Sequence, residues 1–509
     1  MVPEQIREVD VGSSTLLWLG VALVGVIVVA LVLGLRLFPR LKAAQDLIDD
    51  VRQAFTPDRI AGDRGGINMV STVVDLAQPV VNARGGAAAE VPRLVEFVST
   101  QTGLPPGDVL ALLQKEFPHT TGLLIALPLS DVTTELPKLI SFLATTLKLS
   151  QSQVMAAIRS NFPHLNQAIT NLPAVTKNFD AVPDISKLTR FDGSPVRTLP
   201  QVRDYLSGDV VNALETQQKN FRGLDSKGGV LFLAPLLLIL GIIVIIFGTA
   251  MAFGASKGIP HEVSALGWVL VTVVGILVVA LVRALSLYPR LGGGQELLDG
   301  VRPAFDPDRV AGDKASVAFI STAVDTLDPV LTAQGGAAAE VPKLVAFVST
   351  QTGLPQADVL ALLQKEFPHT TGLLTALPLS AVSEEIPKLV AFLANTLKIG
   401  QSQVLSAIRT NFPNLYQAIT TLPAVTGGWS SVPGIPRLTR FSGAQVISVK
   451  QLRDYFKDDV VPLVERQRAN FETVDRTWPR LTVFPPLLVV VGVLVTVYGL
   501  INFGIAAAG

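Results

Sequence analysis

The stretch 85–129, GGAAAEVPRLVEFVSTQTGLPPGDVLALLQKEFPHTTGLLIALPL, recurs at 335–379 with five differences in 45 positions. The match belongs to a repeat of the whole chain, because a shift of 250 residues aligns the two halves without gaps. Under that shift Trp18 falls on Trp268. The sequence therefore predicts two tandem copies of one architecture.

A second repeat of 45 residues lies inside each half. Phe117-Pro118-His119 corresponds to Phe162-Pro163-His164, and the second half follows the same scheme. The chain thus carries four copies of one supersecondary unit, at about 90–134, 135–179, 340–384 and 385–429.

Each unit has a helical pattern. Apolar residues recur at helical spacing after Pro92, which suits the first turn of a helix, and Gly103 is a plausible left-handed end. A second helix stops at the residue before Pro118, because proline breaks the hydrogen-bond ladder. Ser150 with Gln153 forms a capping box in the sister unit. Period-2 strands are not evident, so the prediction is all-α.

Four apolar segments are long enough to span a bilayer, which takes about 20 residues. They divide the chain into a tail (1–13), span 14–38, helical domain 39–228, span 229–254, a loop (255–262), span 263–287, helical domain 288–480 and span 481–509. Trp18 and Trp268, near the span starts, and Arg40 and Arg290, beyond the span ends, are expected to be membrane-interface anchors.

Because each half crosses the membrane twice, both helical domains lie on the same side. The halves are then parallel repeats, related by a pseudo-two-fold axis along the membrane normal. Two units are few for a free-standing repeat domain. Either the two units of one domain pack face to face, or units from both halves share one core and the chain is a fused pseudo-dimer.

Composition excludes several classes of protein. Charged residues are 16% of the chain, and 41 basic residues balance 41 acidic ones, so no nucleic-acid partner is expected. The absence of cysteine excludes disulfides, cysteine-ligated metals and thiol catalysis. No cofactor motif is present, and no cofactor is expected.

The string Pro57-Asp58-Arg59 recurs at Pro307-Asp308-Arg309. One interpretation makes Arg59 and Arg309 contacts to a lipid headgroup or a partner. The other is helix-start chemistry, with proline in the first turn, aspartate beside it and an ion pair from arginine to the aspartate four residues on.

Phe117, His119, Phe367 and His369 are the remaining candidate interaction residues, because the near-identity of 85–129 and 335–379 is typical of a surface used in both copies. Recent gene conversion or tight core packing is the alternative. Histidines at the Phe-Pro-His position could also meet as metal ligands. The fourth copy has Asn414 there, which favours a polar residue that opens the third helix.

The spans contain no aspartate or glutamate, so an ion or proton relay is not expected. The sequence predicts a non-enzymatic membrane-anchored scaffold or interaction protein of a bacterial cell-envelope assembly. Its partners are the lipid bilayer and a protein, or a second copy bound through the helical repeats. The alternative is an accessory protein that binds or transfers lipid or another apolar ligand, and an enzyme comes last.

The expected location is the plasma membrane, with several passes. Basic residues flank the spans on the domain side and indicate a cytoplasmic location, although this rule is weak for loops of about 190 residues. The anchor layout, with almost nothing on the opposite face, favours the extracytoplasmic side.

Overall fold

The computed structural model describes residues 4–81, 86–225, 232–331, 336–435, 437–475 and 480–508. The chain is 84% helical, and no strand occurs among these residues, which confirms the all-α prediction. The chain forms two compact units. Unit 1 comprises Met1–Thr56, Ala213–Asp306 and Leu463–Gly509, and unit 2 comprises Pro57–Asn212 and Pro307–Pro462. Each half of the sequence therefore contributes to both units.

Four helices of unit 1 are long and apolar enough to cross a membrane, with mean hydropathies of 2.3 to 3.0. They are α1 (Glu4–Gly34), α12 (Leu233–Ser256), α13 (His261–Ala284) and α24 (Phe484–Ala508). The prediction of four membrane-compatible segments is confirmed. The first and third end earlier than position 38 and position 287, because Arg36 and Ser286 adopt a left-handed φ of 50° and interrupt the helix.

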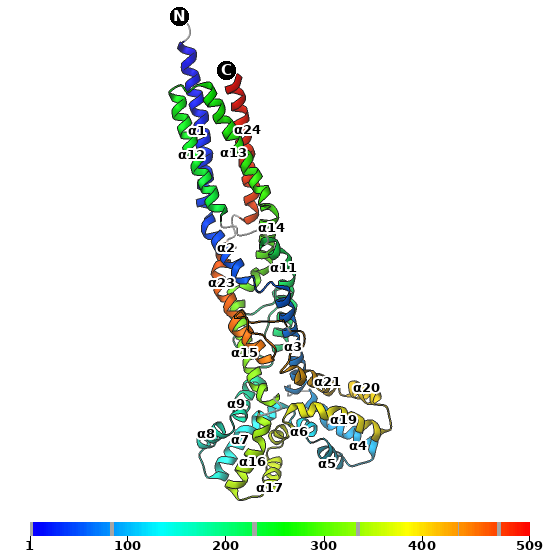
Figure 1. The fold of residues 1–509 in the computed structure, drawn as a ribbon. Coiled ribbons are helices and arrows are strands. Elements are labelled where there is room, and N and C mark those ends of the chain that lie inside the picture. Colours follow the sequence, from blue (N-terminus) through cyan, green and yellow to red (C-terminus); the bar gives the residue numbers. More distant parts are fainter. Residues whose placement is uncertain are drawn as a thin grey trace. The chain divides into compact units, whose positions relative to one another are not determined.

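These four helices associate as two close pairs, α1 with α12 and α13 with α24 (Figure 1). A Cβ on Gly25 would lie 2.7 Å from the Gly241 carbonyl oxygen, and a Cβ on Gly275 would lie 2.7 Å from that of Gly492. In lipid, van der Waals packing holds helices together, and small residues let their backbones approach closely. Glycine at the contact therefore allows each pair to form.

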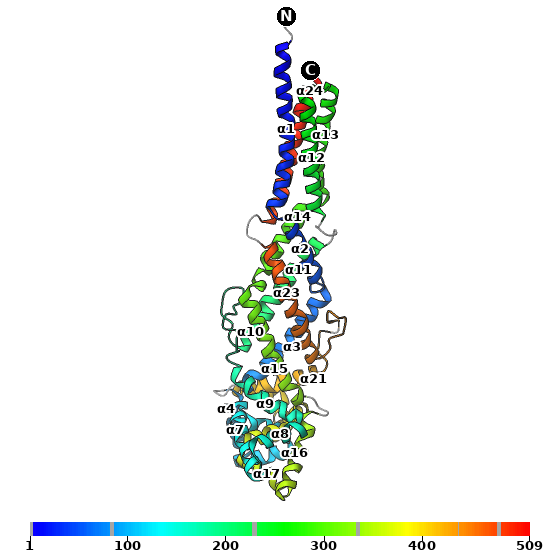
Figure 2. The ribbon, with the colours of Figure 1, turned by 90° about the vertical axis from the view of Figure 1, so that its left-hand side faces the viewer.

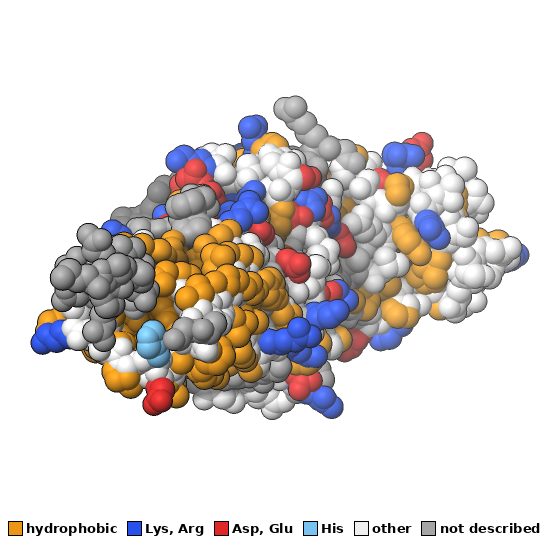
Figure 3. All heavy atoms as spheres, turned by 90° about the horizontal axis from the view of Figure 1, so that it is seen from above, with side chains coloured by type: hydrophobic (Ala, Val, Ile, Leu, Met, Phe, Trp, Pro, Cys, Tyr) orange, Lys and Arg blue, Asp and Glu red, His pale blue; other side chains and the backbone are white. Residues whose placement is uncertain are grey.

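Large aliphatic side chains cover the outward faces of the four helices. Leu23, Ile246 and Leu494 are about 60% exposed, at 59%, 62% and 63%. In the view from above, hydrophobic side chains gather in a broad area with few charged groups (Figure 3). Such a surface is compatible with a lipid bilayer, in which the backbone polar groups are satisfied inside each helix.

The remaining helices of unit 1 continue from the four spans. They are α2 (Leu37–Val51), the greater part of α11 (Val211–Asp225), α14 (Leu287–Val301), the 3-10 turn η2 (Arg302–Phe305), most of α23 (Val461–Val474) and the 3-10 turn η4 (Leu481–Val483). Phe55 stacks on Phe221 with the ring centroids 4.5 Å apart, and Phe305 on Phe471 at 4.4 Å. These stacks join the segments beside the spans across large sequence separations.

Unit 2 contains two series of helices. The first series is α3 (Pro57–Val81), α4 (Ala87–Thr102), α5 (Pro106–Glu116), α6 (Pro118–Ala126), α7 (Leu129–Leu147), α8 (Gln151–Asn161), α9 (Pro163–Asn178), α10 (Leu199–Tyr205) and the π-helical turn η1 (Leu206–Val210). The second is α15 (Pro307–Leu331), α16 (Ala337–Thr352), α17 (Gln356–Glu366), α18 (Pro368–Ala376), α19 (Leu379–Leu397), α20 (Gln401–Asn411), α21 (Pro413–Gly428), α22 (Val449–Tyr455) and η3 (Phe456–Val460).

Local sequence signals set most of these helix ends. Gly103 ends α4 with a φ of 72°, α6 begins at Pro118, and Ser150 with Gln153 caps α8 as expected. The prediction for Pro92 was wrong. The alanines before it extend α4 back to Ala87, so this proline lies inside the helix and removes one of its backbone hydrogen bonds.

The core of unit 2 combines side chains from both halves, so of the two packing alternatives the shared core is the one found. Helix α3 lies beside α21, and α15 lies beside α9 (Figures 1 and 2). Helix α6 crosses α18 where a Cβ on Gly122 would lie 2.8 Å from the Gly372 carbonyl oxygen, and a Cβ on Gly372 would lie 2.7 Å from that of Gly122. The backbones of the two halves approach each other closely here.

Around this crossing the helices form two lobes. In lobe 1, α4 and α5 lie with α19 and α20, and in lobe 2, α7 and α8 lie with α16 and α17 (Figure 1). The apolar core of lobe 1 contains Leu94 and Leu113 from the first half and Leu393 and Ile408 from the second. Neither half therefore completes a lobe by itself.

Candidate functional site

The candidate residues Phe117 and Phe367 are buried between the halves. Phe117, at the junction of α5 and α6, meets Phe392 of α19 edge-on, with the centroids 5.5 Å apart. Phe367 meets Phe142 of α7 in the same way, also at 5.5 Å. Edge-to-face aromatic pairs add to the free energy gained from burial alone. These residues therefore hold the lobes together from inside.

The first turns of the helices that begin at Phe-Pro are closed by glutamates of the opposite half. In α6, the backbone N–H of Thr120 donates to Glu385 at 2.7 Å, its hydroxyl at 2.9 Å and the His119 N–H at 3.3 Å. A helix leaves its first N–H groups unpaired and carries a partial positive charge there. The carboxylate of Glu385 satisfies both requirements from another helix.

The same contact occurs at the other three helix starts of this kind. Leu165 N–H donates to Glu340, Thr370 N–H donates to Glu135, and Leu415 N–H donates to Glu90, each at 2.8 Å. We call Glu90, Glu135, Glu340 and Glu385 the capping glutamates. Each lobe contains two reciprocal caps, so the halves close each other's helices.

Sequence reasoning missed the capping glutamates, although a signal exists. All four stand two residues before a proline, as in Glu90-Val91-Pro92, and lie in the first helix of each 45-residue repeat. The recurrence marks the position as special but does not identify its partners. Those partners lie between 175 and 325 residues away along the chain.

Two histidines at the Phe-Pro-His position make polar contacts with the opposite half. His119 Nδ1 lies 2.8 Å from the Thr375 carbonyl oxygen, and His369 Nε2 lies 3.7 Å from an Asp131 carboxylate oxygen. Among the residues that the structure describes, no group of three or more His, Asp or Glu side chains could hold a metal ion. The histidine positions open their helices, as one of the two interpretations expected.

Arg59 lies in the first turn of α3, which begins at Pro57 as expected. Its guanidinium is buried, lies 4.6 Å from the centre of the Phe441 ring and donates to the Thr439 hydroxyl at 3.3 Å. An arginine over an aromatic face gains cation–π attraction. Helix-start chemistry thus explains Pro57, whereas Arg59 also joins the two halves.

Arg309 makes the equivalent contacts in α15. It donates to the carbonyl oxygens of Thr189 and Arg190, each at 2.8 Å, and lies 5.3 Å from the centre of the Phe191 ring. Both arginines are directed into unit 2. Their contact with a lipid headgroup or a partner stays a prediction that these positions do not favour.

A buried carboxyl lies one turn after each arginine. Burial raises the pKa of Asp63 and of Asp313 to about 7, against the opposing effects of a tyrosine hydroxyl and the neighbouring arginine. Tyr205 donates to Asp313 at 3.3 Å, and burial also raises the pKa of this tyrosine. Near neutral pH the two carboxyls are therefore only partly ionised.

Trp18 and Trp268 are buried among the four apolar helices α1, α12, α13 and α24, which we call the membrane bundle. Their rings stack with the centroids 3.8 Å apart, and the Tyr498 ring meets Trp268 edge-on at 5.6 Å. The Tyr498 hydroxyl donates to the Leu17 carbonyl oxygen at 2.8 Å. The stack joins the α1–α12 pair to the α13–α24 pair, and the anchor role of the tryptophans stays a prediction.

Arg40 and Arg290 are also buried. Arg40 donates to the carbonyl oxygen of Val474, the last residue of α23, and Arg290 donates to that of Leu224 near the end of α11, each at 3.0 Å. A cation at a helix C-terminus neutralises the partial negative charge there. The two arginines thus hold helix ends together, and their role at the membrane interface stays a prediction.

Four exposed aliphatic side chains stand at equivalent places on the lobes. They follow the first helix of each 45-residue repeat and are 38–39% exposed. We call them the tip residues: Leu104, Leu149, Leu354 and Ile399. An aliphatic side chain of similar exposure thus recurs at the turn after the first helix of all four 45-residue repeats.

No protein-family model matches the chain, and no match is found among the curated proteins or the solved structures. Function is therefore inferred from the geometry of the capping glutamates, the tip residues and the membrane bundle.

Proposed function

We propose that the protein is a non-enzymatic, membrane-anchored scaffold of a bacterial cell-envelope assembly that binds a protein partner through its lobes. The chain is interpreted as a fused pseudo-dimer, whose duplicated halves are related by a pseudo-two-fold axis along the membrane normal. Equivalent contacts support this symmetry, since Glu340 to Leu165 and Glu90 to Leu415 are both 2.8 Å.

The observation that carries the proposal is the set of tip residues. A partner that recognises one exposed aliphatic side chain meets the same feature on all four 45-residue repeats. Several weak contacts on one body increase affinity by effective concentration, provided that the geometry permits simultaneous binding. The reciprocal caps favour simultaneous binding, because their charge-assisted hydrogen bonds hold each lobe together and keep its tip residues in place.

Photo-crosslinking tests the scaffold proposal in the cells that produce the protein. Each tip residue is replaced in turn by cysteine, starting with Leu104→Cys, and is labelled with a membrane-permeant benzophenone maleimide. We expect a discrete adduct of higher mass from the tip variants after illumination. Lys115→Cys, at an exposed position on α5 of the same lobe, is the control and should give none. Absence of an adduct from all four tip variants would refute docking through the tips.

The proposed location is the plasma membrane, with the lobes on the extracytoplasmic side. Ser194 is exposed and outside every helix, so Ser194→Cys provides one accessible thiol in a chain without cysteine. A membrane-impermeant maleimide should label this variant in intact cells. Labelling that requires permeabilisation would place the lobes in the cytoplasm and end the envelope interpretation.

A second function, an accessory protein that binds lipid or another apolar ligand, is favoured by one observation. The membrane bundle contains an apolar cavity, lined by side chains of all four of its helices.

A further inference from the structure

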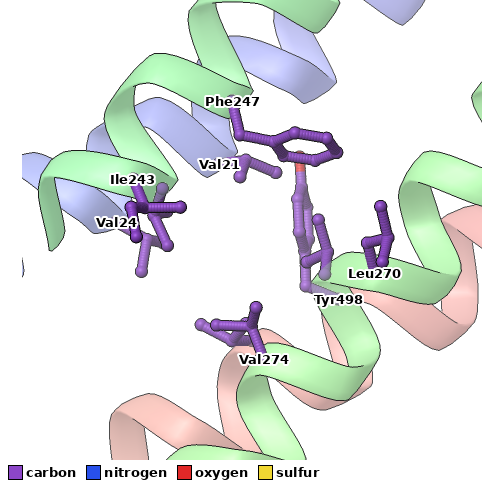
Figure 4. A pocket seen from close by; sticks show the side chains of 10 residues that line it. Val21, Val24, Ile243, Phe247, Leu270, Val274 and Tyr498 are labelled. Atoms are coloured by element: carbon purple, nitrogen blue, oxygen red, sulfur yellow. The ribbon is translucent and has the colours of Figure 1, made fainter. Parts of the chain in front are cut away.

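The cavity lies between the two helix pairs of the bundle (Figure 4). Its volume is about 190 Å³, and hydrocarbon atoms form the whole of its exposed lining. The lining includes Val21 and Val24 of α1, Ile243 and Phe247 of α12, Val274 of α13 and Tyr498 of α24. Because the Tyr498 hydroxyl donates to Leu17, this side chain presents its ring to the space.

The size and chemistry of the cavity select an apolar guest. An apolar protein cavity of about 150 Å³ stays free of water and binds benzene. This cavity is somewhat larger and offers no hydrogen-bond partner, so water is disfavoured and a short length of hydrocarbon chain fits.

The depth of the cavity matches the end of a lipid chain. Val24 and Ile243 each lie ten residues into their apolar stretches, which begin at Ser14 and Leu233. At about 1.5 Å per residue this is roughly 15 Å, half the thickness of a hydrocarbon core of about 30 Å. The methyl ends of lipid acyl chains lie at this depth.

The cavity also reaches the outer surface of the bundle. Ile243 and Leu270 line it, and yet they are 53% and 47% exposed. These residues belong to α12 and α13, which are consecutive along the chain. An acyl chain can therefore enter between α12 and α13 directly from the bilayer.

We propose that this cavity binds the terminal segment of a lipid acyl chain, which fills the space between the α1–α12 pair and the α13–α24 pair. The inference rests on the proposed membrane anchoring. The two pairs meet elsewhere, in the cluster around Trp18 and Trp268 and in a second cluster around Leu37 and Leu287. A bound chain completes the packing between these two contacts, so the lipid acts as a structural ligand of the bundle.

A photoreactive lipid tests the proposal on the full chain. The protein is reconstituted in palmitoyl-oleoyl phosphatidylcholine vesicles that contain a phosphatidylcholine with a diazirine at the end of one acyl chain. Adducts are located by peptide mass spectrometry after illumination. Val274→Phe fills the cavity, whereas Val273→Phe makes the same change one residue away, at a side chain that is 42% exposed and does not line the cavity.

In the wild-type chain we expect adducts at Val21 and Val24, which line the cavity and are not exposed on the outer surface of the bundle. Val274→Phe should reduce their yield at least fivefold, and Val273→Phe should change it less than twofold. The proposal is overturned if adducts form only on outward side chains such as Ile246 and Leu494, or if both variants reduce the yield equally. A lack of adducts on the outward side chains as well would refute membrane anchoring itself, so the two failures are distinguishable.

Discussion

Replacing the capping glutamate Glu385 by alanine should destabilise unit 2 by about 3 kcal/mol, because hydrogen bonds to a charged group contribute roughly 1.5–3 kcal/mol each. Glu385 accepts two short ones, at 2.7 and 2.9 Å, and a longer one at 3.3 Å. Unfolding entropy is about 2.1 cal/mol/K per residue, which over the roughly 310 residues of unit 2 converts this loss into a decrease in Tm of about 5 °C.

Thermal unfolding of the purified full chain, followed by circular dichroism, measures this shift. The neighbouring Glu384 is exposed and provides a matched control in the same helix, so Glu384→Ala should lower Tm by less than 1 °C, about 0.5 kcal/mol or less. Glu385→Gln keeps one acceptor oxygen and should fall between the two. The argument for capping across the halves fails if Glu385→Ala and Glu384→Ala have the same Tm.

Three further outcomes follow from contacts inside unit 2. The pKa of Asp63 and Asp313 is about 7 in the folded protein and about 4 in the unfolded chain. The protonated carboxyls therefore stabilise the fold fully below pH 4, and this contribution is lost as pH rises through 7. Tm should therefore fall between about pH 4 and pH 7, and less so in an Asp63→Asn/Asp313→Asn double variant. Gly122→Ala places a methyl 2.8 Å from a carbonyl oxygen and should cost about 1–3 kcal/mol in denaturant unfolding, whereas Gly107→Ala, with nothing within 4 Å, should not destabilise. Phe367→Ala should cost about 3–5 kcal/mol in the same assay.

Most local features of the fold could be predicted from the sequence. The apolar spans, the helix end before Pro118, the left-handed end at Gly103 and the capping box at Ser150 depend on residues within a few positions of each other. The interactions that set a helix end join residues that are close in sequence, so these ends can be recognised from the sequence alone.

The contacts between the halves could not be predicted in the same way. In the sequence, Glu385 and Arg59 look like ordinary charged residues on the exposed face of a helix. Their partners lie hundreds of residues away along the chain. Repeat symmetry indicated that a shared core was one of two options, but both options have the same hydrophobic pattern. Only the packing distinguishes a polar side chain that caps a distant helix from one that is solvated.

The separation of each capping glutamate from its partner also determines when the fold can be completed during synthesis. Ribosomes add about 5–20 residues per second. Glu385 follows Thr120 by 265 residues, so it is made roughly 13–50 seconds later. Throughout this interval α6 has no cap and the first half has an unfinished core, which is attached to α1 from the start and to α12 once that helix has been made. The nascent chain must wait for its second half before either lobe can close.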